Sequence, residues 1–249
     1  MRTHFVISDT QVKPSVSQNH IDWLARAICH YMPNEIICLG DWWDMESLST
    51  YDMGTINAEG KRYYQDIEAG NEAMKRLINP IKKRMKLKKK WKPKFTFLLG
   101  NHEQRIIRTV KNYPHLKDKL SYDDLYLKDW KVFDFLKVAK IDGVSYSHYF
   151  VNPMTGNPYG GNIQNLIAKL GYSFVMGHKQ VLEFGRKDLT DGNVVMGLIT
   201  GSYYLHDEMY KGPQGNYHWR GCCVLHNVRS GVFDLETLSL DRMKREYGK

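Results

Sequence analysis

Cysteine is scarce in this sequence, with four among 249 residues, at positions 29, 38, 222 and 223. Two of them are adjacent and none belongs to a CxxC pair, which suits a reducing compartment better than a disulfide framework. Long apolar runs are also missing, so no segment approaches the length of a membrane span. The chain passes from Met1 almost directly into an apolar strand at Phe5, which leaves no room for the apolar core of a signal peptide. We therefore expect a cytoplasmic protein that does not associate with a membrane.

The sequence also lacks a linker, an internal repeat or a low-complexity segment that would divide it. With 42% hydrophobic residues, a chain of this length can enclose a sizeable core. We therefore expect a single domain over residues 1–249.

Negative charge is in deficit, with 27 acidic residues against 36 basic ones, so the formal net charge is +9. This balance favours polyanionic partners such as nucleic acid or nucleotides, although many basic proteins bind neither. Much of the excess lies between Lys75 and Lys94, where eleven Lys and Arg occur.

Five apolar segments each stop at an Asp, Asn or His. They are FVISDTQ at 5–11, EIICLGDWWD at 35–44, FTFLLGNHE at 95–103, VSYSHYF at 144–150 and FVMGHKQ at 174–180. Runs of this length that end at glycine or a polar residue are typical of buried strands. The sequence therefore predicts a polar site built from several strand ends.

Helical patterns between these strands predict how the ends meet. Strand 4–8, a helix to about residue 31 and strand 35–39 form a βαβ unit, which makes the two strands parallel. A long helix is expected over 58–87, with Pro80 kinking or interrupting it, and a further helical stretch over 114–130. The remaining elements are expected as strands 132–139 and 143–148, helix 163–170, strand 173–177, and antiparallel strands 181–187, 193–200, 221–228 and 231–234.

The lysines at 86–94 follow the long helix and precede strand 95–99. This order places them at the opposite edge of the sheet from the strand ends. We interpret them as a solvated basic helix end, with an accessory docking surface for nucleic acid as the alternative.

Carboxylates and imidazoles that converge without Lys or Arg would repel one another or stay unsatisfied unless a cation lay among them. A metal site is therefore the simplest explanation of the five strand ends together. Taken singly, each Asp could be a turn former or helix cap, and each His an ordinary hydrogen-bonded residue.

The ordered motifs resemble those of the calcineurin-like metallophosphoesterases, whose pattern is DxH, GDxxD, GNHE, H and GHxH. The matching positions here are Asp9-x-Gln11, Gly40-Asp41-x-x-Asp44, Gly100-Asn101-His102-Glu103, His148 and Gly177-His178-x-Gln180. The resemblance implies a four-layer α/β/β/α sandwich with mixed sheets, two divalent metal ions at the strand ends and a metal-dependent phosphoric ester hydrolase.

The resemblance also implies roles for individual residues. Asp9, Gln11 and Gln180 would hold one metal, Asn101, His148 and His178 the other, and Asp41 would bridge the two. A hydroxide between the metals would attack phosphorus. His102, oriented by Asp44, would face the leaving oxygen as an acid or charge stabiliser.

Two departures from the family pattern fall on one side of the site, where Gln11 and Gln180 replace the usual histidines. Amide oxygens are harder and weaker ligands than imidazole, so this side favours Mn²⁺, with Mg²⁺, Fe²⁺ or Zn²⁺ as alternatives. The same departure leaves open a one-metal or degenerate member of the family.

The substrate class follows from a third difference. Protein phosphatases of the family typically read GDxxDRG, whereas Met45 follows Asp44 here. The pattern is more similar to the phosphodiesterase and nuclease branch, including small stand-alone members familiar from bacteriophages. The alternatives are a phosphomonoesterase or protein phosphatase, or a catalytically weak nucleic-acid-binding protein.

An aromatic loop at 202–219 is a candidate for substrate contact. Tyr204, His206, His218 and Trp219 could stack bases while neighbouring basic residues hold phosphates. An aromatic lid or dimer contact is the alternative. The sequence leaves the oligomeric state open.

Overall fold

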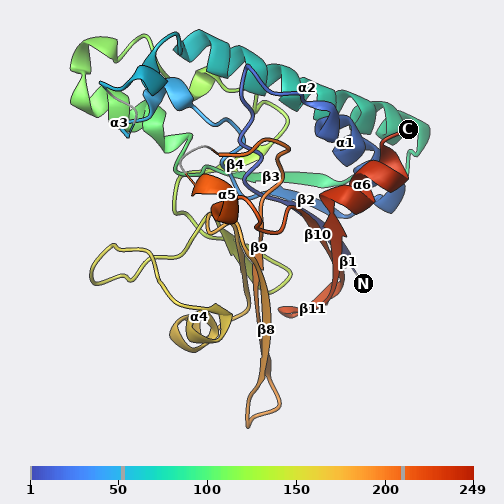
Figure 1. The fold of residues 1–249 in the computed structure, drawn as a ribbon. Coiled ribbons are helices and arrows are strands. Elements are labelled where there is room, and N and C mark those ends of the chain that lie inside the picture. The colour runs from blue at the N-terminus through green and yellow to red at the C-terminus, as the bar shows by residue number, and fades with distance from the viewer. Residues whose placement is uncertain (1, 52–53, 209–210) are drawn as a thin grey trace.

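A computed structural model of the chain describes residues 2–51, 54–208 and 211–249. Two β-sheets lie at its centre (Figure 1). The larger sheet has the strand order β11-β10-β1-β2-β3-β4, and the smaller has β5-β6-β7-β9-β8. The larger sheet consists of β1 (Arg2–Ile7), β2 (Glu35–Cys38), β3 (Lys94–Leu98), β4 (Lys131–Phe133), β10 (Gly221–Arg229) and β11 (Val232–Ser239). The smaller consists of β5 (Ala139–Ile141), β6 (Val144–Ser147), β7 (Phe174–Met176), β8 (Leu182–Asp188) and β9 (Val194–Thr200).

Parallel pairing brings the polar strand ends to one edge of each sheet. Strands β1, β2, β3 and β4 are parallel neighbours, as are β6, β7 and β9. Helix α1 (Asn19–Tyr31) connects β1 to β2, and α2 (Tyr63–Leu87) connects β2 to β3. A crossover helix returns the chain to the edge from which the strand started, so successive strands end on the same side. The predicted βαβ unit is confirmed.

Three apolar layers hold the elements together. Because side chains alternate along a strand, Phe5 faces the helices α1 and α2, whereas the adjacent Val6 faces the smaller sheet. A third apolar layer, which includes Phe174, lies between the smaller sheet and helix α4 (Ile163–Leu170). The order of layers is therefore helix, sheet, sheet, helix, and the fold is the predicted four-layer α/β/β/α sandwich with mixed sheets.

The other described helices are shorter. Helix α3 (Gln104–Asn112) follows β3, α5 (Gly212–Gly215) lies before β10, and α6 (Leu240–Tyr247) ends the chain beside α1. Short 3₁₀ helices span Glu46–Leu48, Ile56–Ala58, Pro114–Leu116 and Tyr122–Asp124. Among the described residues, no helix combines the length and the apolar character needed to cross a membrane.

Three local predictions differ from the structure. Helix α2 begins at Tyr63 rather than near residue 58 and continues past the exposed Pro80 to Leu87, so the proline does not interrupt it. Residues 114–130 form only short 3₁₀ turns, since Asn71 of α2 bonds the backbone there, accepting from Tyr126 N–H at 2.9 Å. Residues 132–139 form two strands in different sheets, with Leu136 at φ 65° between them.

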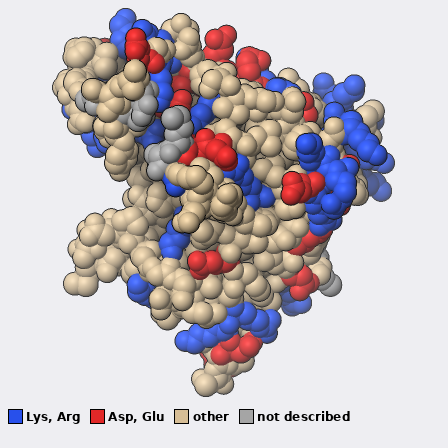
Figure 2. Space-filling model, in the orientation of Figure 1, with Lys and Arg blue, Asp and Glu red and all other residues tan. Residues whose placement is uncertain are grey.

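The lysine run lies at the end of α2 and at the start of β3, whereas Asn101 follows the other end of β3. Figure 2 shows Lys and Arg gathered where Figure 1 places the ends of α2 and α6. This position agrees with the expectation that the run lies at the opposite edge of the sheet from the strand-end residues.

Candidate metal centre

The candidate ligands occupy five strand ends that face one another across the two sheets. Asp9, Asp41 and Asn101 come after β1, β2 and β3 of the larger sheet. His148 and His178 come after β6 and β7 of the smaller sheet. A hydrogen bond connects the strand ends of the two sheets: the backbone N–H of His178 donates to Asp9 Oδ2 at 2.9 Å. The site therefore lies at the seam between the sheets.

Sharp backbone turns aim these side chains. Asp9, Gln11, Asp41, His178 and Gln180 all have positive φ, between 42° and 67°. A left-handed conformation costs a non-glycine residue about 1–2 kcal/mol, so neighbouring contacts must hold each turn in place.

One buried carboxylate holds the turn after β2. Glu103 is fully buried, and it accepts hydrogen bonds from the N–H groups of Asp41, Trp42 and Trp43 at 2.9, 2.7 and 3.2 Å and of Gly100 at 2.8 Å. Four donors converging on one carboxylate bind residues 41–43 to the turn after β3. Glu103 therefore fixes Asp41 relative to Asn101.

Two glycines permit the close approach of these turns. A Cβ at Gly100 would lie 2.1 Å from Asp41 Oδ1, and a Cβ at Gly177 would lie 2.0 Å from Ser8 Oγ. Neither distance is sterically possible, so the glycines of the two motifs are required by packing. They make room for the polar atoms of the adjacent strand ends.

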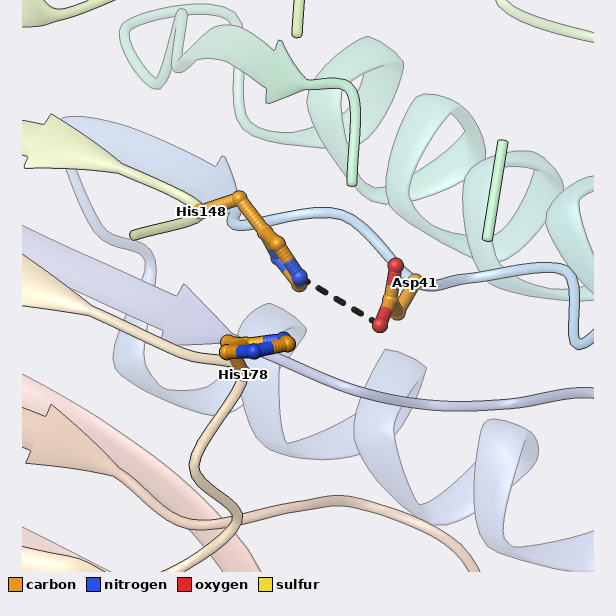
Figure 3. A group of neighbouring side chains, drawn as sticks. All are labelled: Asp41, His148 and His178. Carbon is orange, nitrogen blue, oxygen red and sulfur yellow. Dashed lines mark ion pairs between the residues drawn. The ribbon is translucent and has the colours of Figure 1, made fainter. Parts of the chain in front are cut away.

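The first group of ligand-type residues consists of Asp41, Asn101, His148 and His178, and we call it the histidine group. Figure 3 shows the side chains of Asp41, His148 and His178 pointing toward one another. One ligand atom from each of these three lies within 4.8 Å of the others. Asn101 Oδ1 lies 2.8 Å and Asp41 Oδ2 3.3 Å from His148 Nε2.

The proton position on His148 favours a cation in the histidine group. Its Nδ1 lies 2.7 Å from the carbonyl oxygen of Leu39, and only a protonated nitrogen can bond there. In the neutral ring, Nε2 then carries a lone pair that faces the oxygens of Asn101 and Asp41. Three acceptors facing one another repel unless a cation lies between them. The donor set therefore fits a divalent metal ion.

The pKa values of His148, Asp41 and His178 describe the charge within the histidine group. Burial lowers the pKa of His148, but Asp41 outweighs it and raises this pKa to about 9. Burial also opposes ionisation of Asp41, yet His102 and His148 hold its pKa well below the usual range. Burial and the charge of His148 lower the pKa of His178 to about 4, which leaves a neutral ring with a free lone pair. Without a metal ion, Asp41 therefore favours a proton on His148, and a bound divalent ion would take the place of that proton.

The second group consists of Asp9, Gln11 and Gln180, and we call it the glutamine group. Within the described parts of the chain, the buried atoms Asp9 Oδ1 and Gln11 Oε1 have no hydrogen-bond partner. Gln180 Oε1 differs, because it accepts from Tyr204 O–H at 2.9 Å and from the ammonium group of Lys211. The glutamine group therefore fits a cation in part, with two oxygens available and the third occupied.

His102 lies beside the histidine group. Its Nδ1 lies 2.8 Å from Asp44 Oδ1, and its backbone N–H donates to Asp41 Oδ1 at 2.8 Å. Burial lowers the pKa of His102, but Asp41 and the hydrogen bond to Asp44 together raise it above the ordinary value. His102 and Asp44 therefore lie side by side, while their roles as an acid and its orienting partner stay a prediction.

Comparison with known families identifies the chain. A family model described as calcineurin-like phosphoesterase matches residues 4–222. The chain belongs to the calcineurin-like phosphoesterase family. Members of this family bind a dimetal centre, and the family indicates a metal-dependent hydrolase of phosphoric esters.

Two solved structures are among those that align with the chain. Yfce, a phosphoesterase from E. coli, aligns with a TM-score of 0.41 at 11% identity over 94% of this chain and 98% of its own. A dimetal phosphatase from Danio rerio aligns with a TM-score of 0.43 at 9% identity over 96% of each chain. Comparison with curated proteins gave no significant match.

A guanidinium group contacts the general acid candidate of this phosphoesterase, and sequence reasoning missed it. Arg105 Nη2 lies 3.2 Å from His102 Nε2, and Arg105 Nη1 donates to the carbonyl oxygens of Asp44 and Met45 at 2.8 and 3.1 Å. The available signal was the spacing from His102, because residues 101–103 form a turn that leads into α3, and Arg105 N–H donates to the carbonyl oxygen of His102 at 3.1 Å.

Asp44 also belongs to a second cluster of ligand-type side chains in this phosphoesterase. Asp44, His206 and Glu208 offer ligand atoms within 4.8 Å of one another. Lys13 Nζ, however, lies 3.0 Å from Asp44 Oδ2, 2.9 Å from Glu208 Oε1 and 2.9 Å from Glu46 Oε1. Although burial opposes it, these carboxylates raise the pKa of Lys13. We interpret the set as a buried ion-pair cluster rather than a metal site.

The aromatic loop of this phosphoesterase folds against the glutamine group. Tyr204 is fully buried and stacks on His206, with the ring centroids 4.6 Å apart, while His218 Nε2 lies 3.0 Å from Tyr204 O–H. Trp219 packs on Gly201 and Gly221, where a Cβ would come within 2.5 Å of the indole ring. Residues 209–210 of the loop lie outside the described residues. Substrate contact by Tyr204, His206, His218 and Trp219 stays a prediction.

Proposed function

We propose that this phosphoesterase hydrolyses phosphodiester bonds of nucleic acid or nucleotides and requires divalent metal ions. The observation that carries the proposal is the histidine group, in which Asp41, His148 and His178 offer ligand atoms within 4.8 Å of one another. Asn101 Oδ1 lies 2.8 Å from His148 Nε2 and adds a fourth oxygen or nitrogen ligand. Bound divalent ions would lower the pKa of a water molecule and neutralise the charge that develops on the phosphoryl oxygens.

The metal ligands are proposed group by group. The histidine group would hold one ion tightly, the glutamine group would hold a second ion more weakly, and Asp41 would contribute to both. The unpartnered oxygens of Asp9 and Gln11 support the second assignment, because a buried acceptor without a partner costs about 1–3 kcal/mol that a cation would recover. Oxygen ligands on this side favour Mn²⁺ or Mg²⁺ over Zn²⁺.

His102 would act on the leaving oxygen through Nε2, as an acid or as a charge stabiliser, once the substrate has displaced Arg105 Nη2, which lies 3.2 Å from this nitrogen. Its raised pKa keeps a proton available near neutral pH, and Asp44 fixes the ring through Nδ1. Arg105 donates to two backbone carbonyls beside this pair, so it would orient His102 and add positive charge near the leaving group. No serine or cysteine nucleophile enters this scheme.

The preference for a diester is proposed from the residue that follows Asp44 and from the bonds of Arg105. A monoester phosphate carries more negative charge than a diester, and protein phosphatases of the family meet it with an arginine directly after the second aspartate. Met45 occupies that position here, and the nearby Arg105 is already bonded to the carbonyls of Asp44 and Met45. The net charge of +9 supports a polyanionic substrate.

The test compares hydrolysis of bis-p-nitrophenyl phosphate with that of p-nitrophenyl phosphate by protein stripped of metal and reloaded with Mn²⁺. We expect faster release of nitrophenol from the diester and none without metal. Asp41→Asn should lower the rate at least about a hundredfold, since several kcal/mol of charge stabilisation depend on the metals. Asp188→Asn removes an exposed carboxylate on β8 and serves as the matched control.

The alternatives give different results in the same assay. Faster turnover of the monoester would identify a phosphomonoesterase or protein phosphatase. Binding of single-stranded DNA or RNA without metal-dependent hydrolysis of either ester would identify a nucleic-acid-binding protein that has lost turnover. Either result would overturn the proposal.

A further inference from the structure

One of the two glutamines that depart from the family pattern, Gln180, is in contact with a charged side chain. Gln11 and Gln180 are neutral, so Asp9 is the only charged member of the glutamine group. The ammonium group of Lys211, from the aromatic loop, donates to Gln180 Oε1 and lies 3.0 Å from Tyr204 O–H. A lysine therefore reaches the side of the site where the family has histidine ligands.

The lone pairs of Gln180 are already in use. A carbonyl oxygen has two lone pairs, and Gln180 Oε1 accepts one hydrogen bond from Lys211 and another from Tyr204 O–H, at 2.9 Å. A metal ion could take this oxygen as a ligand only after displacing one of these donors. The Gln180 oxygen therefore accepts hydrogen bonds from the protein and is not available to a metal ion.

Charge opposes a second metal ion at the same place. Burial lowers the pKa of Lys211, while the carboxylates of Glu208, Asp9 and Asp44 oppose this shift, so its ammonium group lies within the field of the site. A divalent ion beside an ammonium group is repelled, and the glutamine group offers little negative charge to offset this. In the histidine group, by contrast, Asp41 is held ionised, and its Oδ2 lies 3.3 Å from His148 Nε2, where its negative charge attracts a cation.

We propose that Lys211 supplies the second positive charge of this site, so that the chain holds one divalent ion tightly in the histidine group. The unpartnered oxygens of Asp9 and Gln11 would then bind a further ion only at high metal concentration. In catalysis, which rests on the function proposed above, the ammonium group would pair with a phosphate oxygen where other family members place a metal.

The test is a titration of metal-free protein with Mn²⁺ in the absence of substrate, followed by equilibrium dialysis and electron paramagnetic resonance. Wild-type protein should bind one ion per chain with the spectrum of an isolated ion, and a second at least about tenfold more weakly. Lys211→Gln removes the charge and keeps a polar side chain. It should strengthen the second binding step by about tenfold or more, which is the effect expected for a divalent ion and a unit charge a few ångströms apart under strong screening. The doubly loaded variant should then give the spectrum of two exchange-coupled ions.

Two further variants serve as controls. Lys211→Arg keeps the charge and should retain the weak second step. Lys187→Gln removes the charge of an exposed lysine on β8 and should leave both binding steps unchanged. A coupled spectrum in the wild-type protein with two ions of similar affinity would overturn the inference, whether or not the variants fold. An unchanged second step in Lys211→Gln would do the same.

The metal titration is independent of turnover. Weak second binding together with absent diester hydrolysis would retain the inference about Lys211 and reject the proposed function. Diester hydrolysis with two tightly bound ions would retain the function and reject the inference.

Discussion

Substitution of Glu103 by glutamine tests whether one buried carboxylate holds the metal centre together. Glu103 Oε1 accepts from the N–H groups of Trp42 and Trp43, and Oε2 accepts from those of Asp41 and Gly100. Glutamine has nearly the same shape but only one carbonyl oxygen. Its amide N–H groups would face two backbone donors that need acceptors, so Glu103→Gln leaves two buried N–H groups unpaired.

The expected loss of stability follows from these bonds. Each buried donor that loses its acceptor costs about 1–3 kcal/mol, so the variant should lose about 2–6 kcal/mol of unfolding free energy. The site should suffer as well, because Asp41 has a φ of 51° and depends on these bonds to stay there. A residue that supports a metal ligand in this way typically changes metal affinity by about 10- to 100-fold, so Mn²⁺ should bind about that much more weakly.

Urea unfolding at pH 8 and Mn²⁺ titration measure the two effects. Burial and the charge of Asp41 raise the pKa of Glu103 to about 7, so the wild-type carboxylate is ionised at this pH. The matched control is Glu183→Gln, since among the described residues Glu183 accepts a single backbone N–H, that of Ile163 at 2.6 Å. It should lose no more than about 1 kcal/mol. A Glu103→Gln variant within about 0.5 kcal/mol of wild type, with unchanged Mn²⁺ affinity, would refute the reasoning.

Three further predictions concern other parts of the site and core. His102→Ala should lower diester turnover by about 10²–10⁴-fold without weakening Mn²⁺ binding, and unchanged turnover would remove His102 from the mechanism. Lys13→Met leaves the carboxylates of Asp44 and Glu208 without their ammonium partner, so urea unfolding should show a loss of about 3–5 kcal/mol, and a loss below 1 kcal/mol would contradict this. Burial lowers the pKa of His20 to about 3, so below pH 6.5 the unfolded chain binds a proton that the folded chain does not. Between pH 7 and pH 5 wild type should therefore lose about 2 kcal/mol more stability than His20→Phe, and equal losses would disprove the assignment.

The strand ends could be predicted because their signal is local. An apolar run followed by glycine and Asp, Asn or His specifies a strand and the polar residue after it, as in residues 35–41 and 95–101. The βαβ rule then placed these ends at one edge. Predictions failed where tertiary contacts outweighed local preference, as in residues 114–130, whose backbone is bonded by Asn71.

The supporting residues of the site had weaker signals. Glu103 was visible as part of its motif, but its four hydrogen bonds depend on the turn at residues 41–43 lying beside it. Arg105 had only its spacing from His102 to mark it. For Lys13 the sequence carried no signal, since its partner Glu208 lies far away along the chain. Lys211 was visible only as a basic residue of the aromatic loop, and its contact with Gln180 was not.

The sequence by itself determined the family, the layered fold and the set of candidate ligands, because strand periodicity and short motifs are written in consecutive residues. It also showed that histidines are replaced by Gln11 and Gln180. Only the tertiary structure decided what surrounds those ligands: a carboxylate that fixes Asp41, a guanidinium group beside His102 and an ammonium group on Gln180. The physical reason is that charge acts through space, so the balance of a site depends on which distant segments fold against it.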